Sequence, residues 1–247
     1  MNARLGFSDL LLPDWPAPEC VRSCTTTRQG GISLPPFDSL NLGTHVEDEP
    51  RAVAENRRRL EVLLGCSPAW LQQVHGVRVV EAEPQRVPLA DASWSATRGV
   101  ACAVLTADCL PVLFCDRDGT RVAAAHAGWR GLAGGVLEET LRALALPPDQ
   151  VLAWLGPAIG VQAFEVGGEV RDAFIASHAH ADLAFVPSPN TGRFLADIYQ
   201  LARIRLAACG VDAVYGGGCC TVNDPRFYSY RRAPRTGRFA SLIWLAD

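Results

Sequence analysis

Two apolar runs on either side of a short polar segment constrain the fold of this chain most strongly. Leu110–Cys115 and Arg121–His126 flank Asp116-Arg117-Asp118-Gly119, whose residue types are typical of a turn. The pattern predicts two antiparallel strands joined by a tight loop. The residues at the open end of this hairpin are therefore expected to lie side by side.

The register of the hairpin predicts that a cysteine and a histidine meet. With a loop at 116–119, Cys115 pairs with Thr120, and Cys109 lies directly opposite His126. Directly opposed residues share one face of the sheet, with Cβ atoms about 4.5–5.5 Å apart. That separation suits two ligands of one metal ion. A slip of one residue would put the two side chains on opposite faces, and spacing alone fits simple packing as well as ligation.

A third ligand must come from elsewhere, and the chain has only five histidines. His178 and His180 follow a predicted helix in a polar stretch and are expected at the surface. His75 ends a strand-like run before a glycine, a position suited to face a cleft. Together, His75, Cys109 and His126 would leave the fourth position of a zinc ion open to water or substrate, which is the pattern of catalytic zinc.

The other patterns along the chain mix strands with helices. Pro50 begins a helix with an apolar stripe, and Gly65 ends it. A second helix follows Gly131. Further helices are expected over 167–178 and 194–209, and strands over 70–74, 77–81, 100–106, 151–155, 211–215 and 240–245. Hairpins together with crossovers favour an α/β or α+β sandwich. Since no repeat or linker interrupts the chain, we expect one domain over residues 1–247.

Charge and composition narrow the class of protein. The net charge is −3, which lacks the basic footprint of a nucleic-acid binder. No apolar stretch is long enough for a signal peptide or a membrane span. Nine cysteines, an odd number without scaffold spacing, indicate reduced thiols. We therefore expect a cytoplasmic monomer that binds neither nucleic acid nor membrane.

Several motifs lie along most of the chain, namely Thr25–Gly31, Asn41–Gly43, Glu55–Arg57, Gln73–Gly76, Thr106–Cys109, Ala125–Gly131, Gly156–Ile159 and Phe227–Arg232. In these motifs and their order the chain resembles the YfiH family, whose members have been described both as laccase-like multicopper polyphenol oxidases and as purine nucleoside phosphorylases. The combination is specific, because each segment carries its own residue pattern. One small departure is the paired Cys219-Cys220, where the family pattern needs only the cysteine before threonine.

The resemblance implies a fold, a metal site and an activity. It implies a four-layer α/β/β/α sandwich with mixed sheets, and one Zn²⁺ held by His75, Cys109 and His126. It also implies phosphorolysis of adenosine, inosine, guanosine and S-methyl-5′-thioadenosine, with adenosine deaminase activity. The expected partners are therefore purine nucleosides and phosphate. Candidate substrate-binding residues within the matching segments are Arg28, Asn41, Gln73 and Arg231.

Two further residues are candidates for catalysis. Arg130 opens a predicted helix, where its side chain and free backbone N–H groups could hold phosphate; the alternative is that it only anchors its loop. Asp108 precedes the candidate ligand Cys109 and is the candidate proton donor, unless it is a solvated loop charge. His45-Val46-Glu47 matches the first half of a zinc-deaminase signature, but no C-x-x-C follows, so the match is interpreted as chance.

Three other functions remain open at the level of sequence. Cys109 activated by His126 would suit an amide hydrolase, and the resemblance to the YfiH family implies one that edits peptidoglycan precursors. A copper-dependent polyphenol oxidase is disfavoured, because the only methionine is Met1 and five histidines cannot build a multicopper cluster. Cu²⁺ could still occupy the site adventitiously. A non-catalytic metal-storing or partner-binding module is the third alternative.

Overall fold

Two β-sheets form the middle of the protein, in a computed structural model that describes residues 5–246. The first sheet has five strands, in the order β1-β2-β14-β6-β3. Their bounds are Leu10–Leu11, Val21–Thr26, Phe239–Leu245, Val100–Thr106 and Ser67–Ala69. Only the β3–β6 pair is parallel, so the sheet is mixed.

The second sheet has six strands, in the order β13-β9-β7-β8-β5-β4. Their bounds are Val214–Gly216, Val151–Leu155, Leu110–Asp116, Val122–Ala127, Ala92–Ser95 and Val79–Glu81. The two outermost pairs are parallel and the inner pairs antiparallel. This sheet contains the hairpin predicted from the sequence.

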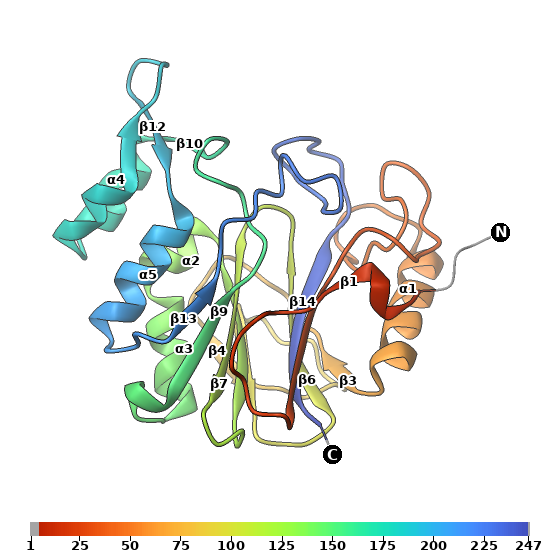
Figure 1. Cartoon of the computed structure of the whole chain (residues 1–247). Coiled ribbons are helices and arrows are strands. Elements are labelled where there is room, and N and C mark those ends of the chain that lie inside the picture. The colour runs from red at the N-terminus through yellow and green to blue at the C-terminus, as the bar shows by residue number, and fades with distance from the viewer. Residues whose placement is uncertain (1–4, 247) are drawn as a thin grey trace.

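Helices cover the outer faces of both sheets (Figure 1). Helix α1 lies beside the five-stranded sheet, and α2, α3 and α5 lie beside the six-stranded sheet. A small sheet β10-β12-β11 with helix α4 extends from the end of α5. The helix bounds are Pro50–Leu64 (α1), Trp129–Gly134 (α2), Val136–Leu144 (α3), Gly168–Ile175 (α4) and Ile198–Ala208 (α5). The small sheet comprises Glu165–Gly167, Arg193–Ala196 and Phe185–Pro187, and three short 3₁₀ helices cover Phe7–Asp9, Pro148–Gln150 and Ala179–Ala184.

Three apolar layers hold these elements together. Between the sheets lie residues such as Val104, Leu113 and Ile243. A second layer joins α1 to the five-stranded sheet, and a third joins α3 and α5 to the six-stranded sheet. The predicted four-layer α/β/β/α sandwich with mixed sheets is therefore confirmed. No helix among residues 5–246 is both long and apolar enough to cross a membrane.

The hairpin forms, but its predicted register is wrong by two residues. Pro111, not Cys109, lies opposite His126. The loop starts one residue later, because the Asp116 carboxylate accepts hydrogen bonds from the backbone N–H groups of Thr120 and Arg121 and so belongs to the strand end. A slip of two residues preserves the face of every side chain. Cys109 and His126 therefore still point to the same side.

Two other predicted elements need correction. Residues 70–74 form only an isolated bridge at Gln72 instead of a strand, because the following backbone N–H groups bond to the Asp91 carboxylate. The predicted helix over 194–209 begins late, since β12 occupies its first residues. The Asp197 side chain then caps α5 by accepting from the N–H groups of Tyr199 and Gln200.

A buried asparagine joins α1 to the loops above it. Asn56 is fully buried; its Nδ2 donates to Ser33 Oγ and to the carbonyls of Ser39 and Asn41, and its Oδ1 accepts from Ile32 N–H. Asn56→Ala is expected to lower the free energy of unfolding by about 2–4 kcal/mol, because it leaves several buried polar groups without a hydrogen-bond partner. Urea unfolding measures the change.

The matched control for this prediction is Val62→Ala on the exposed face of the same helix, which is expected to change stability by only about 0.5 kcal/mol. Equal unfolding midpoints for the two variants would contradict the structural role of Asn56.

Candidate metal centre

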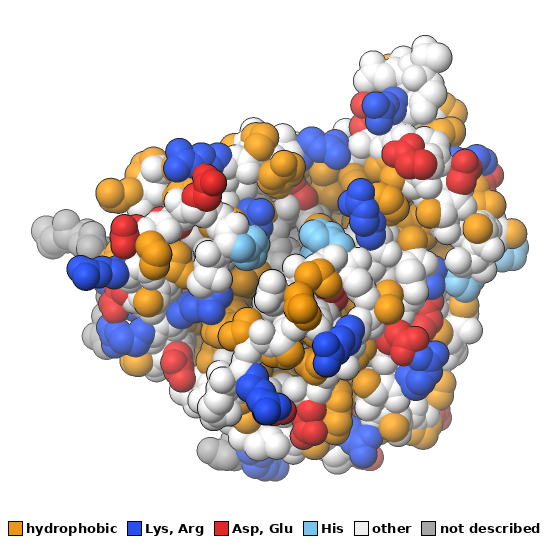
Figure 2. Space-filling model, turned by 180° about the vertical axis from the view of Figure 1, so that it is seen from behind, with side chains coloured by type: hydrophobic (Ala, Val, Ile, Leu, Met, Phe, Trp, Pro, Cys, Tyr) orange, Lys and Arg blue, Asp and Glu red, His pale blue; other side chains and the backbone are white. Residues whose placement is uncertain are grey.

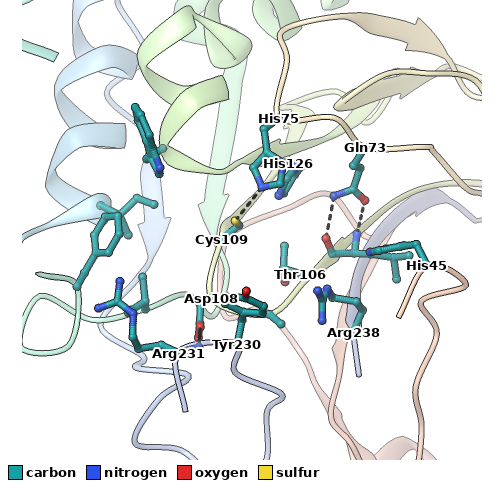
Figure 3. Close-up of a pocket in the computed structure, with 16 residues that line it drawn as sticks. His45, Gln73, His75, Thr106, Asp108, Cys109, His126, Tyr230, Arg231 and Arg238 are labelled. Atoms are coloured by element: carbon teal, nitrogen blue, oxygen red, sulfur yellow. Dashed lines mark hydrogen bonds between the residues drawn. The ribbon is translucent and has the colours of Figure 1, made fainter. Parts of the chain in front are cut away.

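One cysteine and two histidines meet where the β6–β7 connection approaches β8. Among the described residues, the Nε2 atom of His75 lies 3.7 Å from the Sγ atom of Cys109. The rings of His75 and His126 are 4.8 Å apart in an edge-to-face arrangement. The candidate ligand atoms of all three lie within 4.8 Å of one another (Figure 3). The structure thus brings together the three residues that the sequence selected.

A buried carboxylate organises this group. The Asp91 side chain is fully buried, and its Oδ1 accepts from His126 Nδ1 at 2.8 Å and from His75 N–H at 2.9 Å. Its Oδ2 accepts from the N–H groups of Val74 and Gly76. These four bonds hold the turn in which His75 has a positive φ of 59°. With Nδ1 of His126 donating to Asp91, the Nε2 lone pair is free for a metal.

Gly128 makes room for the three side chains. A Cβ atom added there would lie 2.8 Å from His75 Cδ2, 3.0 Å from Cys109 Sγ and 3.5 Å from His126 Nε2. Gly128 also precedes α2, so the chain turns away immediately after the end of β8. Any larger residue would push the candidate ligands apart.

The electrostatics of the group suit a divalent cation. Burial alone would raise the pKa of the Cys109 thiol, but the charge and hydrogen bonds of His126 and His75 outweigh it and lower the pKa to about 6. Burial alone would lower the pKa of His126, but Cys109 and Asp91 raise it to about 9. Both shifts favour a thiolate beside an imidazolium in the metal-free protein, and a bound cation would take the place of the imidazolium proton. One thiolate and two imidazoles are a donor set that zinc accepts.

A cavity of about 380 Å³ opens in front of the group. In Figure 2, histidine side chains lie in and beside a hollow near the middle of the visible face. The lining combines an apolar wall with polar and cationic groups. The apolar wall includes Leu105, Trp129, Ile159, Phe164 and Ile198. Besides the three candidate ligands, the polar and charged lining residues are His45, Gln73, Thr106, Asp108, Tyr230, Arg231 and Arg238. Such a mixture is typical of small-molecule sites.

Three of the predicted site residues lie in this cavity beside the ligand group. Asp108 has a φ of 96°, and its carboxylate accepts from Thr221 Oγ1 at 2.6 Å and from Arg231 N–H at 2.7 Å. Arg231 itself donates from its guanidinium to the carbonyl of Ala163. Gln73 lines the cavity, but both its amide atoms bond to the backbone of Leu105.

The other three predicted residues are not among those that line the cavity. Arg28 pairs with Asp38 at 3.0 Å and lies over the ring of Tyr228. Asn41 is fully buried, and its Oδ1 accepts from Arg238 N–H at 2.8 Å. Arg130 is exposed, with its guanidinium over the adjacent Trp129 ring at 4.3 Å.

Sequence reasoning missed several residues of the site. Asp91 carried a usable signal, because it is a single acid inside the apolar segment Leu89-Ala90-Asp91-Ala92. His45 belongs to the His45-Val46-Glu47 match that the sequence alone leaves without a function, yet it lines the cavity. Arg238 lies in a basic stretch whose pattern does not distinguish it from its exposed neighbours.

The fold and the site together define a four-layer α/β/β/α protein with a cysteine and two histidines grouped at one cavity. The chain belongs to the multi-copper polyphenol oxidoreductase laccase family, whose family model matches residues 22–246. The resemblance to YfiH proteins is also confirmed.

Relatives cover nearly the whole chain. A purine nucleoside phosphorylase of Pseudomonas aeruginosa is 72% identical over 96% of this chain and 98% of its own length. The purine nucleoside phosphorylase YfiH of Escherichia coli is 58% identical over 97% of this chain and 100% of its own. Among solved structures, a Neisseria meningitidis protein matches with a TM-score of 0.94 and 55% identity, covering 97% of this chain and 100% of its own.

Proposed function

We propose that this chain is a zinc-dependent purine nucleoside phosphorylase that cleaves adenosine, inosine, guanosine and S-methyl-5′-thioadenosine and also deaminates adenosine. The observation that carries the proposal is one cysteine and two histidines sharing a cavity with an apolar wall and cationic side chains. The names of the bacterial relatives support the phosphorylase activity. The donor types and the single methionine, Met1, favour zinc over the copper of the family name.

Each part of the cavity has a task in this proposal. A zinc ion held by His75, Cys109 and His126 would supply a Lewis acid beside the substrate. The apolar wall excludes water from one side and offers contact surface to a purine ring. Asp108 acts through positioning, because both its carboxylate oxygens already accept hydrogen bonds that hold Arg231 and the turn before Cys109.

The test combines metal analysis with product identification. Freshly purified protein is expected to contain about one zinc per chain. With adenosine and phosphate it should yield adenine and ribose 1-phosphate, and without phosphate only inosine and ammonia. A zinc-loaded, folded protein that converts none of the four nucleosides would contradict the proposal.

A second candidate function is an amide hydrolase with Cys109 as nucleophile, which the lowered thiol pKa favours. The two functions differ in what protects the thiol. If Cys109 ligates zinc, iodoacetamide is expected to label it only after a chelator removes the ion, because coordination occupies the thiolate. Peptide mass spectrometry measures the labelling.

The half-buried Cys209 at the end of α5 serves as the internal reference in that experiment, since its labelling should not change with chelator. Rapid labelling of Cys109 in protein that retains its full zinc content would favour the hydrolase.

A further inference from the structure

The backbone of Arg238 is fixed by hydrogen bonds at one side of the cavity. Its N–H donates to Asn41 Oδ1 at 2.8 Å, and its carbonyl accepts from Leu42 N–H at 3.1 Å. Gly43 packs so closely that an added Cβ would lie 2.8 Å from Arg238 Cγ. The segment Asn41–Gly43 therefore packs around Arg238 and fixes its position. The fully buried Asn41 thus supports Arg238.

The guanidinium of Arg238 lacks a carboxylate partner among the described residues. Its NH1 atom donates to the carbonyls of Thr236 and Gly237, each at 3.0 Å, and no hydrogen bond or ion pair in the described part of the chain uses Nε or NH2. Burial lowers the pKa of Arg238. A cation that is partly removed from water and unpaired is costly, so a ligand anion would stabilise it.

Arg57 adds positive charge nearby, whereas the His45 imidazole favours its neutral form. Burial lowers the pKa of His45, and so do the neighbouring cations Arg238 and Arg57. Arg57 is itself half-buried, with its guanidinium 4.2 Å from the centre of the Trp70 ring and its Nε donating to the Leu42 carbonyl. By contrast, Arg28, Arg59 and Arg205 all pair with carboxylates. The guanidinium groups of Arg57 and Arg238, together with the neighbouring His45 imidazole as a neutral hydrogen-bonding group, are called the cationic end below.

Three nearby groups act on Arg238 by charge, and none of them forms an ion pair with it among the described residues. Cys109, Asp108 and Tyr230 raise its pKa. The Asp108 oxygens already accept from Thr221 and Arg231. The Cys109 thiolate would be shared with a metal ion. The cationic end thus keeps its charge when the site is assembled.

The opposite side of the cavity differs in chemistry. Figure 3 shows His45, Gln73 and Arg238 on one side of Cys109 and Arg231 on the other. The Arg231 side carries Phe164, since Arg231 donates to the carbonyl of the preceding Ala163, and the segment at Phe164 pairs with Ala196 just before Ile198. The Arg231 side therefore combines an aromatic ring with a guanidinium, and the other side carries Arg238 and His45.

We propose that inorganic phosphate, the second substrate of the phosphorolysis, binds at the cationic end against Arg238 and His45, while the purine base lies against Phe164 and Ile198. The inference rests on the proposed function, and it assigns phosphate to a different arginine from Arg130, which lies outside the cavity lining. In the reaction, a phosphate oxygen forms a bond to C1′ of the ribose as the C1′–N9 bond breaks. The bonding electrons leave with the base, which takes up the proton that phosphate loses.

Arg238→Gln tests the assignment in the zinc-loaded protein. Isothermal titration with inorganic phosphate, without nucleoside, is expected to show binding weakened at least about tenfold, because a charge-assisted pair is lost. The KM for phosphate should rise similarly, with zinc content unchanged and the KM for inosine altered less than about threefold. Arg238→Lys keeps the charge but lacks the planar guanidinium, so its phosphate affinity should lie between those of the wild type and Arg238→Gln.

The matched control is Arg235→Gln, which removes the same charge three residues earlier. Arg235 is exposed and lies over the Phe37 ring, away from the cavity lining, so wild-type phosphate binding is expected. Should Arg238→Gln fail to fold, the Arg238→Lys variant decides. Unchanged phosphate binding in the folded Arg238 variant, or an inosine KM that rises as much as the phosphate KM, would overturn the inference.

Two further measurements distinguish a nucleotide ligand from free phosphate, and failure of the proposed function from failure of this inference. Tighter binding of adenosine 5′-monophosphate than of phosphate, lost in Arg238→Gln, would assign the cationic end to a nucleotide's phosphate and overturn the inference. If the wild type converts no nucleoside, the proposed function fails, yet the phosphate titration still decides the role of Arg238. No phosphate binding by the zinc-loaded wild type would overturn the inference itself.

Discussion

Replacing Cys109 by alanine is expected to remove both zinc and nucleoside turnover. The thiolate is the only anionic donor of the three-residue group, and without it two imidazoles cannot retain the ion through gel filtration. The loss of activity should exceed the roughly 100-fold that follows from losing a residue that merely supports a ligand. His126→Ala is expected to behave in the same way. Elemental analysis and chromatography of nucleoside products measure the two effects.

Cys20→Ala is the matched control, because Cys20 is a half-exposed thiol that contacts Gly119 far from the cavity lining. It should keep both zinc and activity. A zinc-free Cys109→Ala protein with full phosphorolysis would show that the metal takes no part in the reaction.

Asp91→Asn is expected to have the next largest effect, although Asp91 is not a candidate ligand. Its two oxygens accept four N–H groups, from His126 and from the backbone of residues 74–76. An asparagine has one acceptor oxygen, and its NH₂ group would face N–H donors. Zinc affinity should therefore fall roughly 10–100-fold, with activity following at limiting zinc.

Competition with a chromophoric chelator measures the affinity. Asp118→Asn, the same change in the exposed hairpin loop, should leave it unaltered. An Asp91→Asn protein with wild-type zinc affinity would mean that the ligand turn holds its shape without the carboxylate.

The sequence was most informative about the ligand group. The hairpin pattern placed Cys109 and His126 on one face, and this survived a register error because side chains alternate with a period of two. His75 followed from elimination among five histidines and from the resemblance to the YfiH family. These inferences needed only local periodicity and residue chemistry.

The surroundings of the ligand group could not be predicted in the same way, because they depend on contacts between distant segments. Asp91 organises a turn sixteen residues earlier in the chain. Asn41, a candidate substrate-binding residue, accepts a hydrogen bond from Arg238 at the other end of the sequence. His45 reaches the cavity from a loop without regular structure. No periodic pattern records such pairings.

The two halves of the cavity are attached to different sheets. Cys109 and His126 adjoin β7 and β8, and Asp91 ties His75 to the start of β5, all in the six-stranded sheet. Arg238 directly precedes β14 of the five-stranded sheet. The gap between the thiolate and the guanidinium is thus set by side chains such as Leu113 and Ile243, which keep the layers apart. Exchanging one of these for a bulkier or smaller hydrocarbon would change the spacing between the two sheets, and with it the distance between the two halves of the cavity, while leaving every cavity residue intact.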